Sequence, residues 1–123
     1  MKIHFIAHDG HASTATVVLP SWYGPAANPP LPLVISPHGR GATGASNAAL
    51  WGDLPALGRF VVVSPDGEGK RLNRFSWGAP GQIDDLARMP AIVERAVRGL
   101  RIDRARVYAF GGSMGGQETL LLV

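Results

Sequence analysis

Five consecutive residues late in the 123-residue sequence have the composition of a catalytic turn: Gly111-Gly112-Ser113-Met114-Gly115. They match the pattern G-x-S-x-G, in which a serine stands on a tight turn between a strand and a helix. Glycines at 111, 112 and 115 allow this turn, because side chains there would collide with the neighbouring strand and helix. The turn lifts the serine hydroxyl clear of the sheet, so Ser113 is the candidate nucleophile.

A nucleophilic serine also needs donors for the negative charge that develops on the substrate oxygen. The backbone N–H of Met114 is the first expected donor, because it lies at the start of the helix predicted to follow. A second glycine-rich segment follows a predicted strand and reads Pro37-His38-Gly39-Arg40-Gly41. We expect the amide of Arg40 to be the other donor, with Gly41 next to it, and His38 to orient this loop.

The surrounding sequence predicts alternating strands and helices, which give an α/β fold with a mostly parallel sheet. Two short strands within 3–19 are expected to form an antiparallel hairpin about a two-residue turn, Asp9-Gly10. Apolar runs and helical spacing predict the later elements: strands at 33–35, 60–63 and 107–110, and helices at 46–57, 84–99 and 119–123. Because Pro90 stands inside the second helix, we expect a kink there or a start near Met89.

Composition limits the remaining function classes. The chain is 46% apolar and 17% charged, which suits a single domain over residues 1–123. It has no cysteine, which excludes a disulfide framework and thiolate catalysis. The net charge of +3 is small for a nucleic-acid-binding protein, and no apolar run is long enough for a membrane span. We expect a soluble, cytoplasmic protein that binds neither nucleic acid nor membrane.

With its motifs in this order, the sequence resembles the α/β-hydrolase superfamily, in particular its serine esterase and prolyl-oligopeptidase-like branch. The resemblance is carried by His38-Gly39-Arg40-Gly41, Pro65-Asp66-Gly67 and the glycine-flanked Ser113. It implies hydrolysis of a carboxylic ester or peptide through an acyl-enzyme on Ser113, with a small-molecule ester or peptide substrate and without cofactor or metal. Trp77, in the long loop after Asp66, is the candidate aromatic residue that faces the substrate.

The resemblance places an acidic residue and then a histidine after the nucleophile. Only ten residues follow Ser113, and neither histidine nor aspartate is among them. We therefore interpret the chain as the N-terminal half of a longer hydrolase that ends just after the serine turn and is inactive by itself. The strand before Ser113 would then be an exposed edge of the sheet, which favours self-association.

Two other interpretations remain open. Gly39, Gly41 and Gly44 also satisfy G-x-G-x-x-G after a strand, and Asp66 follows the next strand, as in dinucleotide-binding Rossmann-like domains. Three residues separate the strand from the first of these glycines, however, where the Rossmann turn is normally tight. The other alternative is a non-catalytic remnant that binds a ligand or a partner chain through the open edge of its sheet.

Overall fold

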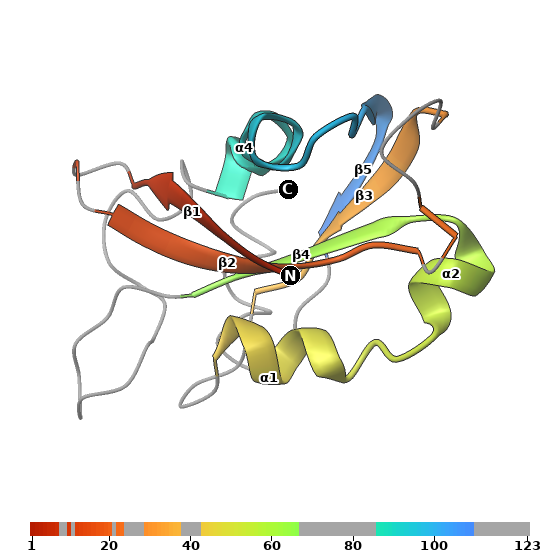
Figure 1. The fold of residues 1–123 in the computed structure, drawn as a ribbon, viewed down its shortest axis with the longest axis horizontal. Helices are drawn as coiled ribbons and strands as arrows, with labels where there is room; N and C mark the ends of the chain where they lie inside the picture. The colour runs from red at the N-terminus through yellow and green to blue at the C-terminus, as the bar shows by residue number, and fades with distance from the viewer. Residues whose placement is uncertain are drawn as a thin grey trace.

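In a computed structural model, five strands form one mixed sheet with the order β1-β2-β4-β3-β5 (Figure 1). The strands are β1 (Lys2–Ile6), β2 (Ala12–Val18), β3 (Leu31–Ile35), β4 (Val61–Pro65) and β5 (Ile102–Ala109). Helix α4 (Met89–Ala96) lies on one face of the sheet, while α1 (Gly44–Ala49) lies on the other and is followed by α2 (Leu54–Gly58). The structure describes residues 1–7, 10, 12–20, 22–23, 29–37, 43–66 and 86–109.

The strand pairings combine an antiparallel and a parallel half. Strand β2 pairs antiparallel with both β1 and β4, whereas β3 pairs parallel with both β4 and β5. The α/β class with an N-terminal antiparallel hairpin, predicted from the sequence, is confirmed. The middle strand β4 is buried along its whole length, which agrees with its continuous apolar run and with helices on both faces.

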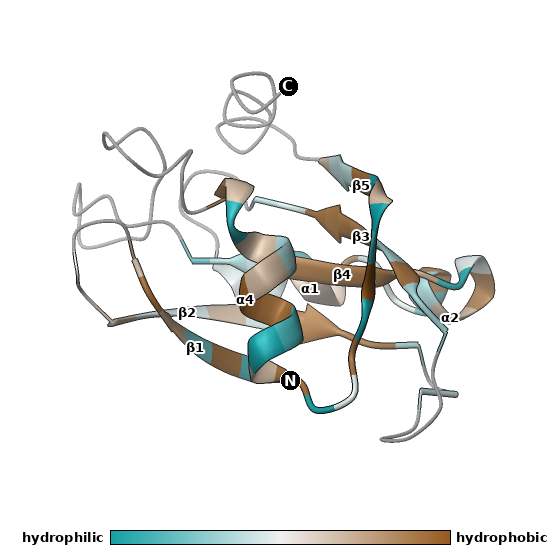
Figure 2. Cartoon of the chain, turned by 90° about the horizontal axis from the view of Figure 1, so that it is seen from above, coloured by the Kyte–Doolittle hydropathy of each residue, from teal (hydrophilic) through white to brown (hydrophobic). Residues whose placement is uncertain are grey.

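The core lies between α4 and the sheet. Met89 and Val93 stand four residues apart on one stripe of α4, and both are fully buried with Leu86 against the apolar side chains of the strands. Figure 2 shows α4 lying across the strongly hydrophobic β4. Pro90 occupies the first turn of α4, where its missing N–H costs no helical hydrogen bond, so the predicted start near Met89 is confirmed. None of the helices in the described ranges is long and apolar enough to span a membrane.

The prediction of a two-residue turn at Asp9-Gly10 is wrong. Ile6 pairs with Ala12, which leaves an odd number of residues between the strands, whereas a two-residue turn requires an even number. Gly10 has φ +84°, and its N–H donates to the carbonyl oxygen of Ala7 at 3.0 Å. A left-handed glycine at this place is typical of hairpins that close through a longer loop.

The single helix predicted for 46–57 is replaced by the two short helices α1 and α2. Gly52, with φ +53°, separates them, and Pro55 lies in the first turn of α2. A proline in the middle of one continuous helix would break it, whereas at the start of a new helix it is tolerated. Phe110 and the predicted helix at 119–123 lie outside the described residues.

Strand β5 begins five residues earlier than predicted and contains a bulge. Leu31 pairs with Ile102, but Leu33 already pairs with Val107, so four residues of β5 stand opposite Pro32 alone. Proline has no N–H to donate to a neighbouring strand, and a bulge at this point avoids an unpaired ladder position. The regular part of β5 is therefore Val107–Ala109, close to the predicted strand.

The bulge is held by a carboxylate. The N–H of Ala105 donates to Oδ1 of Asp103 at 3.0 Å, and Nε of Arg106 donates to Oδ2 at 2.8 Å. The hydrogen bond from Arg106, followed by that from the Ala105 amide, lowers the pKa of Asp103 below its ordinary value of 3.8. Both bonds favour the charged carboxylate, so folding should stabilise the ionised form of Asp103.

The Asp103→Asn variant should unfold at a lower urea concentration than the original chain at pH 7, because it loses the ionised partner of Arg106. The lowered folded-state pKa means that this stabilisation is present above about pH 4 and is lost as the pH falls through the folded-state value. Urea midpoints at pH 7, 5 and 2.5 should therefore differ between the two proteins at the higher pH values and converge at the lowest. Asp53→Asn, at an exposed carboxylate that makes no capping hydrogen bond, is the control. An equal difference at pH 7 and 2.5 would contradict the assignment.

Candidate active site

The carboxyl ends of strands β3, β4 and β5 lie side by side at one end of the sheet. Each strand leads into a segment that carries one of the sequence motifs. Ile35 at the end of β3 is the register partner of Val63 in β4 on one side and of Ala109 in β5 on the other. Because these three strands are parallel, their carboxyl ends point the same way, which is where open α/β sheets bind ligands. The strand that precedes the His38 loop and the strand that precedes Ser113 are therefore direct neighbours.

The predicted site residues themselves lie outside the described residues: Ser113, Met114, Arg40, Gly41, Gly111, Gly112, Gly115, His38 and Trp77. Their positions and the distances between them stay predictions. The structure describes instead the strands that lead into these segments and both flanks of residues 38–42. Among the described residues, no group of three or more His, Asp or Glu side chains is placed to hold a metal ion.

The flank before residue 38 is fixed by a buried polar network around Ser36, which is 2% exposed. Nδ2 of Asn47 lies within hydrogen-bond distance of the carbonyl oxygen of Ser36 (2.8 Å), its hydroxyl (2.9 Å) and the hydroxyl of Ser64 (2.9 Å). Ser64 in turn donates to the carbonyl oxygen of Ser36 at 2.7 Å, and Nε1 of Trp51 lies 3.2 Å from the Ser36 hydroxyl. Helix α1 is thus tied to the ends of both β3 and β4. We call Ser36, Asn47, Trp51 and Ser64 the serine anchor.

The flank after residue 42 is fixed by the start of α1. The Thr43 hydroxyl accepts from the N–H of Ser46, and the Ser46 hydroxyl accepts from the N–H of Thr43, which forms a capping box. The N–H of Gly44 donates to Oδ1 of Asp66 at 2.7 Å. A Cβ atom on Gly44 would overlap the carbonyl oxygen of Ser64, so only glycine lets the helix come this close to β4.

Asp66 joins three parts of the fold. Oδ1 accepts from Gly44 at the start of α1, Oδ2 accepts from the Thr14 hydroxyl of β2 at 2.5 Å, and its own N–H donates to the carbonyl oxygen of Thr14. We call Thr14, Gly44 and Asp66 the aspartate anchor. The sequence singled out Asp66 as part of the Pro65-Asp66-Gly67 segment and as the acidic residue of the dinucleotide-binding alternative. The structure adds that it connects the end of β4 to β2 and to the start of α1.

Sequence reasoning missed the serine anchor. Ser64 interrupts an apolar strand that is otherwise buried, and a buried hydroxyl in such a place almost always has a hydrogen-bond partner. This signal indicates that a partner exists but does not identify Asn47, which is 17 residues away. Thr43 and Ser46, three residues apart before an alanine-rich helix, were a readable capping signal.

Comparisons with known proteins agree with this arrangement. Over 99% of its length the chain superimposes on the thermostable carboxylesterase EstE1 cloned from a metagenomic library, with a TM-score of 0.68 and 26% identity. It also superimposes on an S-formylglutathione hydrolase from Agrobacterium tumefaciens (TM-score 0.71, 20% identity, 98% of this chain) and on an esterase from Pyrobaculum calidifontis (0.69, 23%, 99%). No protein-family model and no curated protein matches the sequence.

The chain spans only 39%, 51% and 38% of these three proteins, respectively. It therefore has the fold of a part of these hydrolase chains, an incomplete α/β-hydrolase fold as the sequence predicted. The neighbours are esterases and hydrolases, which agrees with the superfamily expected from the motifs.

Gly44→Ala should lower the free energy of unfolding by about 1–3 kcal/mol, because the added methyl group forces α1 away from the Ser64 carbonyl. Urea denaturation followed by circular dichroism measures the change. Ala45→Ser adds one heavy atom at the exposed neighbouring position and should change the stability by less than about 0.5 kcal/mol. Equal stability of Gly44→Ala and the original chain would show that this close approach is absent.

Asn47→Ala should lower the free energy of unfolding by about 1–3 kcal/mol, because it removes a donor shared by three buried acceptors and leaves the Ser64 hydroxyl without one. Ser64→Ala should cost less when Asn47 is already alanine, since the two side chains belong to one network. A double-mutant cycle on these two positions measures this coupling. Strictly additive effects would contradict the hydrogen bonds of the serine anchor.

Proposed function

We propose that this sequence carries the nucleophile and oxyanion-binding parts of a serine hydrolase that cleaves carboxylic esters. Ser113 is the nucleophile, and the backbone N–H groups of Met114 and Arg40, with Gly41 beside it, bind the developing oxyanion. The observation that supports this best is the parallel pairing of Ile35 with Ala109. It places the starts of the two motif segments on adjacent strands.

The lengths of the two segments are compatible with this role. Arg40 is five residues beyond Ile35, and Ser113 is four residues beyond Ala109. Paired strands are about 4.8 Å apart, and a chain advances by at most about 3.3–3.6 Å per residue. Both segments can therefore reach a common point above the ends of β3 and β5 without any rearrangement of the sheet.

The two anchors supply the rigidity that an oxyanion site needs. Donors stabilise a transition state well when they are already oriented, because no free energy is then spent on ordering them during the reaction. The serine anchor holds the chain before residue 38, and the aspartate anchor and the capping box hold it from Thr43 onwards. Only five residues, 38–42, lie between these fixed points, so the proposed donor Arg40 belongs to a short connection.

In the proposed reaction, Oγ of Ser113 attacks the ester carbonyl carbon while a general base takes its proton. The carbonyl oxygen becomes an oxyanion bound by the N–H groups of Met114 and Arg40. The carbon–oxygen bond to the leaving group then breaks, and the protonated base returns its proton to the departing alcohol. Water releases the acyl group from the serine by the same steps, with water as the nucleophile.

We propose that the base and its acidic partner come from residues beyond those of this sequence, because the superfamily that it resembles places both after the nucleophile. His4 is the one histidine among the described residues, and it lies on β1, at the opposite edge of the sheet from β5. Four strand spacings of about 4.8 Å separate these edges by roughly 19 Å, so His4 is too far from β5 for proton transfer to a group at the end of that strand. We therefore propose that the activity belongs to a protein in which further residues complete the site.

The structural similarity to a carboxylesterase and to another esterase favours ester substrates over peptides. Cleavage of peptides, as in prolyl-oligopeptidase-like enzymes, stays the alternative, and parallel assays with an ester and a peptide anilide separate the two. The dinucleotide-binding alternative receives less support, because both carboxylate oxygens of Asp66 already accept hydrogen bonds from Gly44 and Thr14.

Ser113→Ala, made in the protein that contains this sequence, should abolish labelling by a fluorophosphonate probe. It should also lower kcat for p-nitrophenyl acetate by about a thousandfold or more, because the nucleophile is removed. Ser13→Ala, which changes a serine in β2, is the control and should leave both unchanged. Labelling or turnover that survives in Ser113→Ala would overturn the proposed function.

A further inference from the structure

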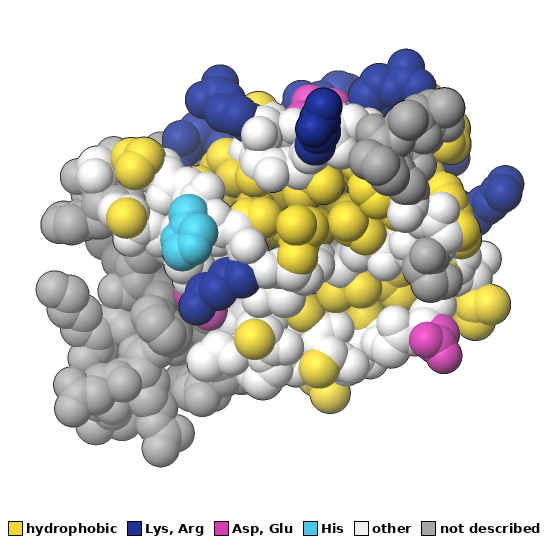
Figure 3. Space-filling model, viewed as in Figure 1, with side chains coloured by type: hydrophobic (Ala, Val, Ile, Leu, Met, Phe, Trp, Pro, Cys, Tyr) yellow, Lys and Arg dark blue, Asp and Glu magenta, His cyan; other side chains and the backbone are white. Residues whose placement is uncertain are grey.

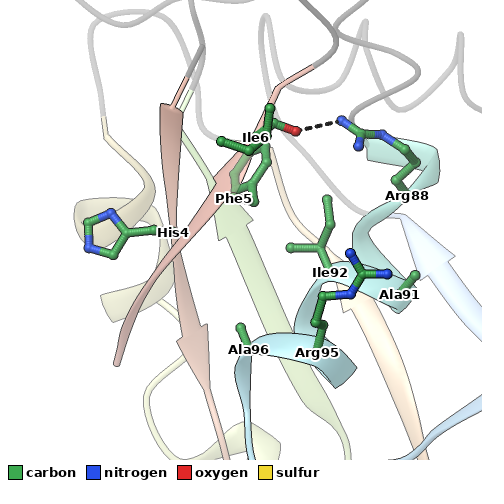
Figure 4. Close-up of a pocket in the computed structure, with 8 residues that line it drawn as sticks. All are labelled: His4, Phe5, Ile6, Arg88, Ala91, Ile92, Arg95 and Ala96. Carbon is green, nitrogen blue, oxygen red and sulfur yellow. Dashed lines mark hydrogen bonds between the residues drawn. The ribbon is translucent and has the colours of Figure 1, made fainter. Parts of the chain in front are cut away.

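A hollow of about 460 Å³ lies between β1 and α4, at the opposite lateral edge of the sheet from β5. It is lined by His4, Phe5, Ile6, Arg88, Ala91, Ile92, Arg95 and Ala96. Its volume falls within the range of about 300–1,000 Å³ that is usual for small-molecule sites. Figure 4 shows the Phe5 and Ile92 side chains between the two elements, while the His4 ring points away from α4.

Five of the eight residues that line the hollow are apolar. Phe5 and Ile92 are partly buried at the rim of the core and form the floor, and Ala91 and Ala96 leave room above it because their side chains are single methyl groups. Phe5 points toward α4 because alternate residues of a strand face opposite sides of the sheet, and its neighbours His4 and Ile6 are exposed. Hydrophobic side chains also show on the surface of this face, below a row of basic side chains drawn in dark blue (Figure 3).

Two guanidinium groups stand over these walls. Arg88 and Arg95 are two helical turns apart on the same side of α4 as Ile92. Nη2 of Arg88 donates to the carbonyl oxygen of Ile6 at 3.0 Å, which fixes this guanidinium at one end of the hollow (Figure 4). The guanidinium group of Arg95 makes no hydrogen bond or ion pair with any described residue. No acidic side chain is among the residues that line the hollow.

The acidic residue next to Arg95 in the sequence is already engaged elsewhere. Oε2 of Glu94 accepts from the N–H of Ile102 at 2.7 Å, and Oε1 is paired with Arg104. Glu94 therefore connects α4 to β5 and does not neutralise the positive charge of Arg95 at the hollow. Positive charge above an apolar floor is complementary to a molecule with a carboxylate at one end and a hydrocarbon body at the other.

We propose that this hollow binds an amphiphilic monocarboxylate, a short- to medium-chain fatty-acid anion. The hydrocarbon chain lies on Phe5 and Ile92, and the carboxylate pairs with the guanidinium of Arg95. Arg88, held by Ile6, adds positive charge at the other end. None of the lining residues belongs to the proposed active site, so binding here does not depend on the proposed hydrolysis.

Titration of the ¹⁵N-labelled chain with sodium hexanoate tests the proposal. Hexanoate should shift the amide resonances of Phe5, Ile92 and Arg95 in a saturable way. Acetate, which has the charge without the hydrocarbon, and 1-hexanol, which has the hydrocarbon without the charge, should each bind at least about fivefold more weakly. No saturable shift with hexanoate would overturn the proposal, and so would equal binding of either control compound.

Variants separate this site from general attraction of anions to a basic surface. Arg95→Gln should weaken hexanoate binding by about fivefold or more, whereas Arg98→Gln should change it by less than about twofold. Arg98 is exposed just after α4, does not line the hollow, and its replacement removes the same charge. Ala96→Phe should fill the hollow and remove binding, with the folded state checked by circular dichroism. Equal effects of Arg95→Gln and Arg98→Gln, or full affinity in Ala96→Phe, would contradict the assignment.

Discussion

The parallel pairing of β3 with strands on both of its sides is the constraint on which the rest of the structure depends. A central parallel strand must be covered on both faces, which is why α1 and α4 lie on opposite sides of the sheet. The same pairing sets Ile35 level with Val63 and Ala109, so that the segments after β3, β4 and β5 leave the sheet at the same end. The backbone hydrogen bonds of the sheet therefore set the relative positions of these three strand ends.

The buried hydroxyl groups beneath this edge show how a loop can be fixed at its ends. Ser36 and Ser64 are almost fully buried, which is unfavourable unless every polar atom finds a partner. Their partners come from α1, and this requirement determines where the helix sits relative to β3 and β4. An apolar contact of similar area would hold the helix against the sheet but would tolerate sliding. Directional bonds confer the specific position.

Much of this fold could be predicted from the sequence, because its signals are local. The apolar runs of β3 and β4 and the proline at the start of α4 each act within a few residues. The hairpin register was mispredicted because Asp9-Gly10 has a strong two-residue preference that the observed pairing of Ile6 with Ala12 overrides. The serine anchor could not be predicted from the sequence, because its residues come together only when α1 packs on the sheet. For the proposed active site, the sequence provides the residues and the structure provides the strands that lead to them.

The bulge in β5 has a consequence for the length of the chain between α4 and the serine turn. Residues 103–106 face only Pro32, and they are held by Asp103 and by the pair of Arg104 with Glu94. Their number is not fixed by the ladder, so a residue gained or lost there would change the size of the protrusion and leave Ala109 level with Ile35. The bulge before the serine turn can therefore vary in length without shifting the strand register. An insertion or deletion within Val107–Ala109 would shift it.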